Sequence, residues 1–201
     1  MLQQLRPAFV LLLLLTLLTG IAYPLAVTGV AQTILPAQAN GSLLQKDGAL
    51  TGSRLIGQNF TSDRYFHGRP SATSAPDPAD ATKTVDAPYN AANSSGANLG
   101  PTSQKLIDRV KADAEAWKKT AGAGPIPGDA LTTSASGLDP HVSPQTALAQ
   151  SASVAKARNL APERVRALVE QMIERPALGL FGEPRVNVLL LNLALDRLGT
   201  G

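Results

Sequence analysis

The strongest hydrophobic pattern of the chain is a continuous apolar run near its N-terminus. Residues 8–27 carry no charge, and twelve of these twenty positions are Phe, Val, Leu or Ile. As a helix the run is about 30 Å long, which matches one hydrocarbon core, and its insertion is worth roughly −4 to −7 kcal/mol. The pattern predicts a single transmembrane helix over residues 8–30.

A cleaved signal peptide is the alternative interpretation of this run. Ala37-Gln38-Ala39 supplies a small-residue cleavage pattern. The apolar core of a signal peptide is about 7–15 residues long, whereas here no charge occurs between Arg6 and Lys46. We therefore favour a retained anchor, and the absence of Cys excludes a lipoprotein.

The flanks of the run predict its orientation. Residues 1–7 carry Arg6 and the free amine. Short positive flanks stay in the cytoplasm, and a large domain behind them is translocated largely regardless of its own charge. We expect residues 1–7 in the cytoplasm, residues 31–48 as a loosely structured exit linker, and residues 49–201 as one domain on the outer side.

From residue 49 to residue 101 the apolar positions follow no helical period. Residues 49–69 predict short extended pieces separated by glycines. Residues 70–101 are rich in Ala, Ser, Thr, Asn, Pro and Asp, which indicates loop. Because long unstructured loops are uncommon inside a compact domain, we expect a mobile insertion over residues 73–87 and an ordered polar turn region over residues 88–101.

The first helix of the outer domain is predicted over residues 102–119, with Thr102 as its cap. Its apolar face comprises Leu106, Val110, Ala114 and Trp117. A brief strand is expected over residues 131–136. The next helix, over residues 144–158, begins at the favourable pair of Ser143 as cap and Pro144 as first residue.

Two further segments complete the predicted elements. Asn159 closes the preceding helix in a left-handed conformation, and Pro162 begins another that Pro176 stops. Residues 186–198 favour a buried helix capped by Asn187, with a strand over the first half as the alternative. Together the elements predict a mixed α/β (α+β) domain anchored by one N-terminal transmembrane helix.

Charge and composition narrow the function classes. Without Arg6, the 18 basic residues become 17 against 15 acidic ones, so the outer domain is nearly neutral. The Lys and Arg residues are scattered along the chain, which argues against nucleic acid as a partner. With no Cys, disulfides and thiolate metal sites are excluded.

Candidate chemistry is sparse. His67 is interpreted as a packing or hydrogen-bonding residue. Asp139 and His141 can be interpreted as a carboxylate that orients an imidazole, with Ser134 or Ser136 as nucleophile, but no glycine elbow surrounds either serine. A hydrolase is therefore disfavoured, and a turn-forming role is the better account of Asp139. The 88–101 turn region remains a candidate for ligand binding.

Several motifs, taken in order, resemble one family. They are Gly52-Ser53-Arg54-Leu55-Ile56-Gly57-Gln58, Tyr65-Phe66-His67-Gly68-Arg69-Pro70-Ser71, Tyr89-Asn90, Asn98-Leu99-Gly100-Pro101-Thr102, Ser136-Gly137-Leu138-Asp139-Pro140-His141-Val142-Ser143-Pro144, and Gly182-Glu183-Pro184-Arg185-Val186-Asn187-Val188-Leu189 followed by Asn192-Leu193-Ala194-Leu195-Asp196. This set is similar to the C subunit of the Kdp potassium-transporting ATPase over nearly the whole chain. Two departures are the turn at residues 94–97 and the insertion at residues 73–87.

The resemblance implies a non-catalytic accessory subunit in a bacterial inner-membrane complex. In that complex one subunit forms a channel-like potassium path, a P-type ATPase subunit hydrolyses ATP, and a small membrane subunit is a further partner. The family is described as a catalytic chaperone that raises the ATP affinity of the ATPase subunit. ATP and potassium are then handled by the complex, no cofactor or metal is expected on this chain, and its outer domain is periplasmic.

Two sets of candidate contact residues follow. In the anchor, small and hydroxyl residues recur every four positions and favour packing between membrane helices; they are Thr16, Gly20, Pro24 and Thr28. In the outer domain the family motifs supply candidate partner residues, namely Gln58, Tyr65, Phe66, His67, Arg69, Asn98, Asp139, His141, Glu183, Arg185 and Asn187. The alternatives are a membrane-anchored periplasmic hydrolase or a ligand-binding module.

Overall fold

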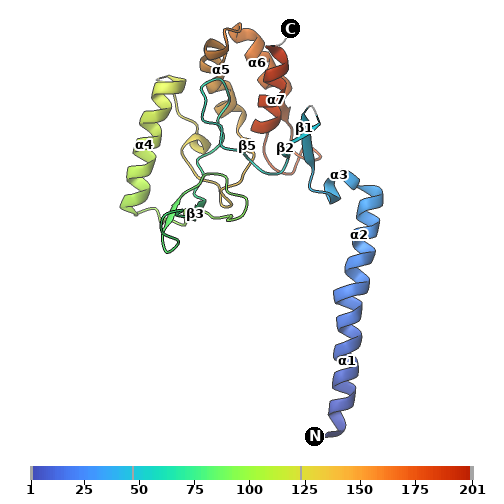
Figure 1. Cartoon of the computed structure of the whole chain (residues 1–201). Helices are drawn as coiled ribbons and strands as arrows, with labels where there is room; N and C mark the ends of the chain where they lie inside the picture. The colour runs from blue at the N-terminus through green and yellow to red at the C-terminus, as the bar shows by residue number, and fades with distance from the viewer. Residues whose placement is uncertain (1, 47, 123, 200–201) are drawn as a thin grey trace. The chain divides into compact units, whose positions relative to one another are not determined.

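The computed structural model describes residues 2–46, 48–122 and 124–199, and the chain divides into two compact units, Met1–Ser53 and Arg54–Gly201 (Figure 1). The first unit is dominated by a continuous helix over Leu2–Ile34, long and apolar enough to cross a membrane. It consists of η1 (Leu2–Gln4), α1 (Leu5–Leu17), η2 (Leu18–Ala22) and α2 (Tyr23–Ile34). The predicted helix over residues 8–30 is thus extended at both ends.

The middle of this helix contains a π-helical turn, η2. The Tyr23 N–H bonds to the Leu18 carbonyl, five residues back. Pro24 follows directly, and its ring has no N–H and clashes with the carbonyl four residues earlier in a regular α-helix. The wider turn therefore lies where Pro24 disturbs the regular pattern.

The segment after the anchor is more ordered than predicted. The short helix α3 (Pro36–Ala39) is followed by β1 (Leu43–Lys46) and β2 (Ala49–Ser53), which pair antiparallel with a bulge between Leu44 and Gln45. Gly41 forms a turn at φ 85°. The expectation of a loosely structured linker over residues 31–48 is wrong because the backbone groups are bonded within these elements, which composition alone does not reveal.

The second unit, which we call the outer domain after its expected location, is built on three helices and a small sheet. The helices are α5 (Pro144–Arg158), α6 (Pro162–Gln171) and α7 (Val188–Leu198). The sheet has the order β5 (His141–Val142), β7 (Arg185–Asn187), β6 (Ile173–Glu174), with both pairs antiparallel. Helices and sheet enclose one core, formed by Phe66, Val142, Ala147, Val154, Ala155, Val165, Val169, Val186, Val188, Leu191 and Leu195.

The predicted helix ends of this core are confirmed. Ser143 Oγ accepts from the Thr146 N–H at 3.1 Å, and Asn187 Oδ1 accepts from the Leu190 N–H at 3.1 Å. Each bond satisfies a donor that the first turn leaves free. Asn159 ends α5 with φ 56° and ψ 39°, the left-handed conformation expected there.

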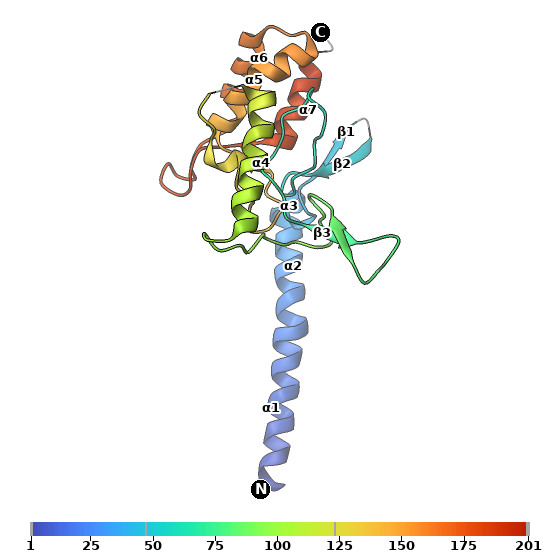
Figure 2. The same ribbon diagram turned by 90° about the vertical axis from the view of Figure 1, so that its left-hand side faces the viewer.

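A fourth helix, α4 (Gln104–Ala121), stands beside the core helices (Figure 2). It begins after Ser103 instead of the predicted cap Thr102. Its apolar face is half-buried at Leu106, Val110, Ala114 and Trp117, as the pattern predicts, and its other residues are mostly exposed. Residues 131–136 form no strand; the short helix η3 (Gly128–Ala130) precedes them instead.

The expected loop over residues 73–87 contains a hairpin. β3 (Ser74–Pro76) pairs with β4 (Thr84–Asp86) in antiparallel register. Thr73, at the base, is only 2% exposed, and its hydroxyl donates to the Ala87 carbonyl at 2.6 Å. The composition hides this hairpin because its strands are mostly exposed and pair only with each other.

Residues 54–72 contain no strand, which corrects the prediction of extended strand pieces over residues 49–69 beyond β2. Side-chain amides replace the missing strand partners. Asn192 accepts from the Phe66 N–H at 2.9 Å and donates to the Phe66 carbonyl at 3.0 Å. Asn187 donates to the Arg54 carbonyl at 2.9 Å. The segment therefore crosses the core with its buried backbone groups satisfied.

Candidate functional site

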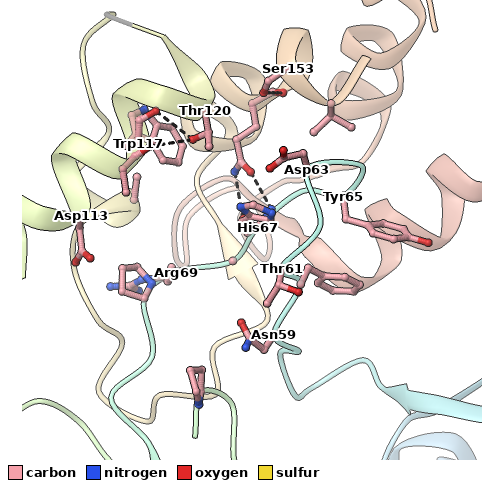
Figure 3. A pocket seen from close by; sticks show the side chains of 18 of the residues that line it. Asn59, Thr61, Asp63, Tyr65, His67, Arg69, Asp113, Trp117, Thr120 and Ser153 are labelled. Carbon is pink, nitrogen blue, oxygen red and sulfur yellow. Dashed lines mark hydrogen bonds between the residues drawn. The ribbon is translucent and has the colours of Figure 1, made fainter. Parts of the chain in front are cut away.

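A cleft of about 950 Å³ lies in the outer domain. The segment containing residues 59–71 forms one wall, α4 forms the opposite wall, and α5 contributes residues of the third side. In Figure 3, Trp117 and Thr120 of α4 lie across from Asp63 and Tyr65, with His67 between them. The cleft thus exists because α4 stands beside the core helices instead of packing fully onto them.

The backbone of His67 is held by a side chain of α5. Gln150, 5% exposed, accepts from the His67 N–H at 2.8 Å and donates to the His67 carbonyl at 3.2 Å (Figure 3). The His67 ring lies 3.2 Å from the Ser62 carbonyl through Nε2. The imidazole is therefore held within its own segment, in agreement with the predicted hydrogen-bonding role.

Tyr65 is likewise held by neighbours. Its ring lies 5.4 Å from the Phe60 ring, and the Arg158 guanidinium is 4.6 Å from its centroid. Arg158 is almost fully buried and bonds to Asp196 at 2.9 Å. This stack ties the segment to α5 and α7 and gives Tyr65 a structural role at the edge of the cleft.

The charges of the cleft have both signs. Arg69, Lys119 and Lys156 line it together with Asp63 and Asp113. Such a lining produces no single-sign field that would favour a highly charged ligand. The cleft suits a neutral or mixed-charge partner group of modest size.

A second, shallower pocket of about 260 Å³ brings together five predicted partner residues. Its lining contains Arg69, Asp139, His141, Glu183 and Arg185. These residues come from three motifs that are far apart in the sequence. Antiparallel pairing of β5 with β7 places His141 opposite Asn187, next to Arg185, and so joins two of the motifs.

Asp139 is the centre of the polar contacts in this pocket. Its carboxylate accepts from Arg69 at 3.1 Å, from the His141 backbone N–H at 3.0 Å, and lies 3.4 Å from His141 Nδ1. Burial alone raises the pKa of Asp139, but the hydrogen bonds from His141 and Arg69 outweigh it, so the pKa lies below its usual value. The carboxylate therefore favours its ionised form and contacts both the Arg69 guanidinium and the His141 imidazole.

Tyr89 belongs to the turn region and contacts Arg69, a residue that lines both pockets. Its hydroxyl donates to the Arg69 carbonyl at 2.7 Å, and burial together with the nearby Asp139 charge raises the pKa of Tyr89 to about 12. A Cβ at Gly57 or at Gly68 would overlap the Tyr89 side chain. The two glycines of the motifs therefore make room for this phenol, which remains a donor at neutral pH.

Comparison with known proteins identifies the family. The family described as "K+-transporting ATPase, c chain" matches residues 5–197. The chain belongs to this family. Proteins named "Potassium-transporting ATPase KdpC subunit" from Methylobacterium nodulans and Bradyrhizobium diazoefficiens are 62% and 61% identical to it over 198 and 197 residues, and each alignment covers 98% of both chains. A relative of the same name from Methylorubrum extorquens is 62% identical over 195 residues, 97% of each chain.

The resemblance drawn from the motifs is thereby confirmed. The structure places the motif residues of this KdpC-family chain in the core, in the lining of the two pockets, or outside both. Phe66 and Asn187 are 0% and 1% exposed and belong to the core. Asn98 is exposed and adopts φ 49°, so it forms a turn. Gln58 is half-buried outside both pockets. The remaining candidate residues line one or both pockets; they are Tyr65, His67, Arg69, Asp139, His141, Glu183 and Arg185.

The arrangement suggested for a hydrolase does not assemble. Asp139 does contact His141, but Ser136 Oγ accepts from the Leu138 N–H, and Ser134 is 7% exposed. Within the described residues neither serine hydroxyl bonds to His141, and no group of three or more His, Cys, Asp or Glu residues is placed to hold a metal ion. In the anchor, Thr16, Gly20, Pro24 and Thr28 are all exposed.

The sequence analysis missed three residues that build the site. Gln150 and Asn192 hold the backbone of the cleft wall, and Asp129 accepts from Ser143 and Thr146 at the start of α5. The two amides could have been found from the sequence. Gln150 and Asn192 lie among apolar residues on the inner faces of α5 and α7, and a polar side chain at such a position needs a buried hydrogen-bond partner.

Proposed function

We propose that the chain is a non-catalytic accessory subunit of a high-affinity ATP-driven potassium import complex, and that it assists assembly and raises the ATP affinity of the P-type ATPase subunit. The observation that carries the proposal is the extent of the family match. Residues 5–197 include both the apolar helix and the whole outer domain up to α7. The complete architecture, and not one motif, therefore supports the role.

The proposed orientation constrains how such a role operates. With the N-terminus in the cytoplasm, the outer domain faces the periplasm, on the opposite side from cytoplasmic ATP. The effect on ATP affinity then passes through the anchor and the partner subunits. The chain stabilises the conformational state of the ATPase subunit that binds ATP more tightly, and it does so by contacting that state more favourably.

The test compares the complete complex with a complex purified without this chain. ATP binding is measured by titration on both, in the same detergent and potassium concentration. We expect the complete complex to bind ATP at least several-fold more tightly. Equal affinities, with both complexes intact by size-exclusion chromatography, contradict the proposed effect on ATP.

A ligand-binding module is the second candidate function, and the 950 Å³ cleft is the observation that favours it, since ligand pockets are of roughly 300–1,000 Å³. Trp117 lines the cleft and is the single Trp of the chain. Its fluorescence therefore reports occupancy. Titration of the isolated full chain with ATP should leave the emission unchanged if the chain acts through its partners; a saturable change would favour direct binding.

A further inference from the structure

The connection between β6 and β7 is a tightly ordered turn. Ala177 and Phe181 exchange two backbone hydrogen bonds of 3.0 Å, and Leu180 N–H donates to the Ala177 carbonyl at 3.1 Å. Leu178 and Gly179 adopt φ 54° and 74°, a conformation that is uncommon for a residue as bulky as Leu. The residues 177–181 are named here the apolar turn.

The apolar turn holds its large side chains in solvent. Leu178, Leu180 and Phe181 are 89%, 81% and 68% exposed. The other exposed large apolar residues in the described part of the outer domain, Leu55, Val85 and Ile107, lie far from one another in the sequence. Single exposed apolar residues are normal, whereas a cluster on an ordered loop marks an interaction site.

The base of the apolar turn carries charges of both signs. Glu174 accepts from Arg54 at 2.8 Å and from Arg185 at 3.2 Å. Glu183 and Arg185 also line the 260 Å³ pocket that contains Asp139. Attachment to an anionic lipid surface uses an excess of Lys and Arg. The base and the pocket together have no such excess, because Arg54, Arg69, Arg175 and Arg185 are matched by Asp129, Asp139, Glu174 and Glu183. An apolar centre with a polar rim, and with Phe and Arg among its residues, is typical of a protein interface.

We propose that the apolar turn and the adjoining charged pocket form one docking surface for another protein subunit of the same complex. The partner offers an apolar socket for Leu180 and Phe181. Beside it, the partner presents groups complementary to the balanced charges of Glu183 and Arg185. The inference rests on the proposed function, because it requires that the chain works inside the assembled complex.

A photo-crosslinking experiment on the assembled complex tests the docking surface. The photoreactive amino acid p-benzoylphenylalanine replaces Phe181 in one variant and Val85, also exposed, in a control variant. Irradiation should join residue 181, and not residue 85, to one other subunit of the complex, identified by mass spectrometry. Adducts from residue 181 with lipid alone or with a second copy of the chain, or a yield no greater than at residue 85, overturn the proposal.

A matched pair of variants measures the contribution of the contact. Leu180→Ser combined with Phe181→Ser should shorten the lifetime of the purified complex in mild detergent at least about tenfold, since central apolar anchors dominate interface stability. Val85→Ser should leave the lifetime unchanged, and both variants should melt like the parent because the changed side chains are exposed. If the double variant leaves the lifetime unchanged while the chain still raises ATP affinity, the docking surface is wrong and the proposed function stands. If the parent chain itself fails to join the complex, the proposed function fails.

Discussion

At the scale of single residues, buried amides carry much of the outer domain's organisation. Asn192 bonds both backbone groups of Phe66, and Gln150 bonds both backbone groups of His67. Each amide supplies one donor and one acceptor, which is what a neighbouring strand would supply. Removal of either side chain leaves two backbone groups without these partners, and those of Phe66 are buried.

We therefore predict that Asn192→Leu destabilises the outer domain although it keeps the approximate volume. Each unsatisfied backbone group costs about 1–3 kcal/mol, so the loss is a large fraction of the stability of a domain. Chemical denaturation of the full chain in mild detergent measures the change. Gln104→Leu is the control, because that exposed amide bonds only to the exposed Asp108; a comparable loss in both variants contradicts the argument.

Asp139 gives the stability of the domain a specific pH dependence. Its pKa is lowered from the ordinary value of 3.8, so the folded state favours the ionised carboxylate. The stabilisation is fully present above the unfolded pKa and is lost as the pH falls from about 3.8 through the folded pKa.

We predict that Asp139→Asn costs about 1–3 kcal/mol near neutral pH, where charge-assisted hydrogen bonds are lost. The difference between parent and variant should shrink below pH 4, when the parent carboxylate becomes protonated. Denaturant midpoints measured from pH 6 down to pH 3 test this. Glu174, whose pKa is also lowered, is present in both proteins and drops out of the difference. A difference that stays constant over this range contradicts the electrostatic explanation.

At the scale of elements, the β3–β4 hairpin and its base behave as separate structural parts. The strands are mostly exposed and pair only with each other, whereas Thr73 at the base is buried and bonds to Ala87. Stability should therefore depend on the base and hardly at all on the tip.

We predict that replacement of residues 77–83 by Asn-Gly lowers the melting temperature by no more than a few degrees. The dipeptide forms a two-residue turn that matches the Pro76–Thr84 pair. Thr73→Ala should lower it more, since it removes buried hydrogen bonds. Differential scanning fluorimetry compares the two, and a larger loss from the shortened tip would show that the tip packs against something essential.

The anchor contains an element that changes how its small residues line up. In a regular α-helix, positions four apart drift by about 40° around the axis. A π turn is wider than an α turn because its hydrogen bonds join residues five apart, so η2 acts against this drift between Thr16, Gly20 and Pro24. We therefore expect the three residues to lie close to one line along the helix.

From this alignment we predict that Gly20→Leu weakens assembly more than Leu13→Ala does. Apart from the helix's own nearby backbone, no atom of the described residues lies within 4 Å of an added Cβ at Gly20. The isolated helix therefore accepts the larger residue, but close approach of another helix is blocked. Co-purification with the ATPase subunit at matched expression quantifies both variants. Equal recovery would exclude this line of residues as a helix contact.

At the scale of the whole molecule, the chain divides after residue 53 into a unit that contains the apolar helix and a second folded unit. The expected orientation of the chain rests on its charged N-terminal flank and is open to a direct chemical test. Because the chain has no Cys, a single introduced thiol reports its own location.

We predict that Ala81→Cys is labelled by a membrane-impermeant maleimide in intact cells with a permeabilised outer membrane. Ala81 lies at the exposed tip of the β3–β4 hairpin. Gln3→Cys, exposed at the other end of the anchor, should be labelled only after lysis. The reverse pattern would place the outer domain in the cytoplasm and would require a different account of the effect on ATP.

Features that depend on interactions between residues close in the sequence were predictable, and features that depend on distant residues were not. The caps Ser143, Asn159 and Asn187 were predictable because each acts within one helical turn. The β3–β4 hairpin was not, since few of its residues are apolar. The path of residues 54–72 was hidden for another reason: it depends on amides 83 to 133 residues away.

The same limits apply to the candidate site. The motif residues of the 260 Å³ pocket were each noted, but their convergence depends on strand pairing between residues more than 40 positions apart, as in His141 with Asn187. The exposed apolar turn left no periodic signal, because three large residues within a short loop resemble an ordinary core segment in the sequence.

The side-chain hydrogen bonds from Asn187 at the end of β7 and from Asn192 in α7 back to Arg54 and Phe66 also fix the order in which the protein can mature. They join positions 133 and 126 residues apart, and contacts between such distant positions form late and slowly. The apolar helix leaves the ribosome first and can enter the bilayer at once, whereas the outer domain must wait for its last helix. A nascent chain stalled or cleaved before residue 187 therefore remains tethered to the membrane but unfolded, which exposes it to proteases before it can reach its partners.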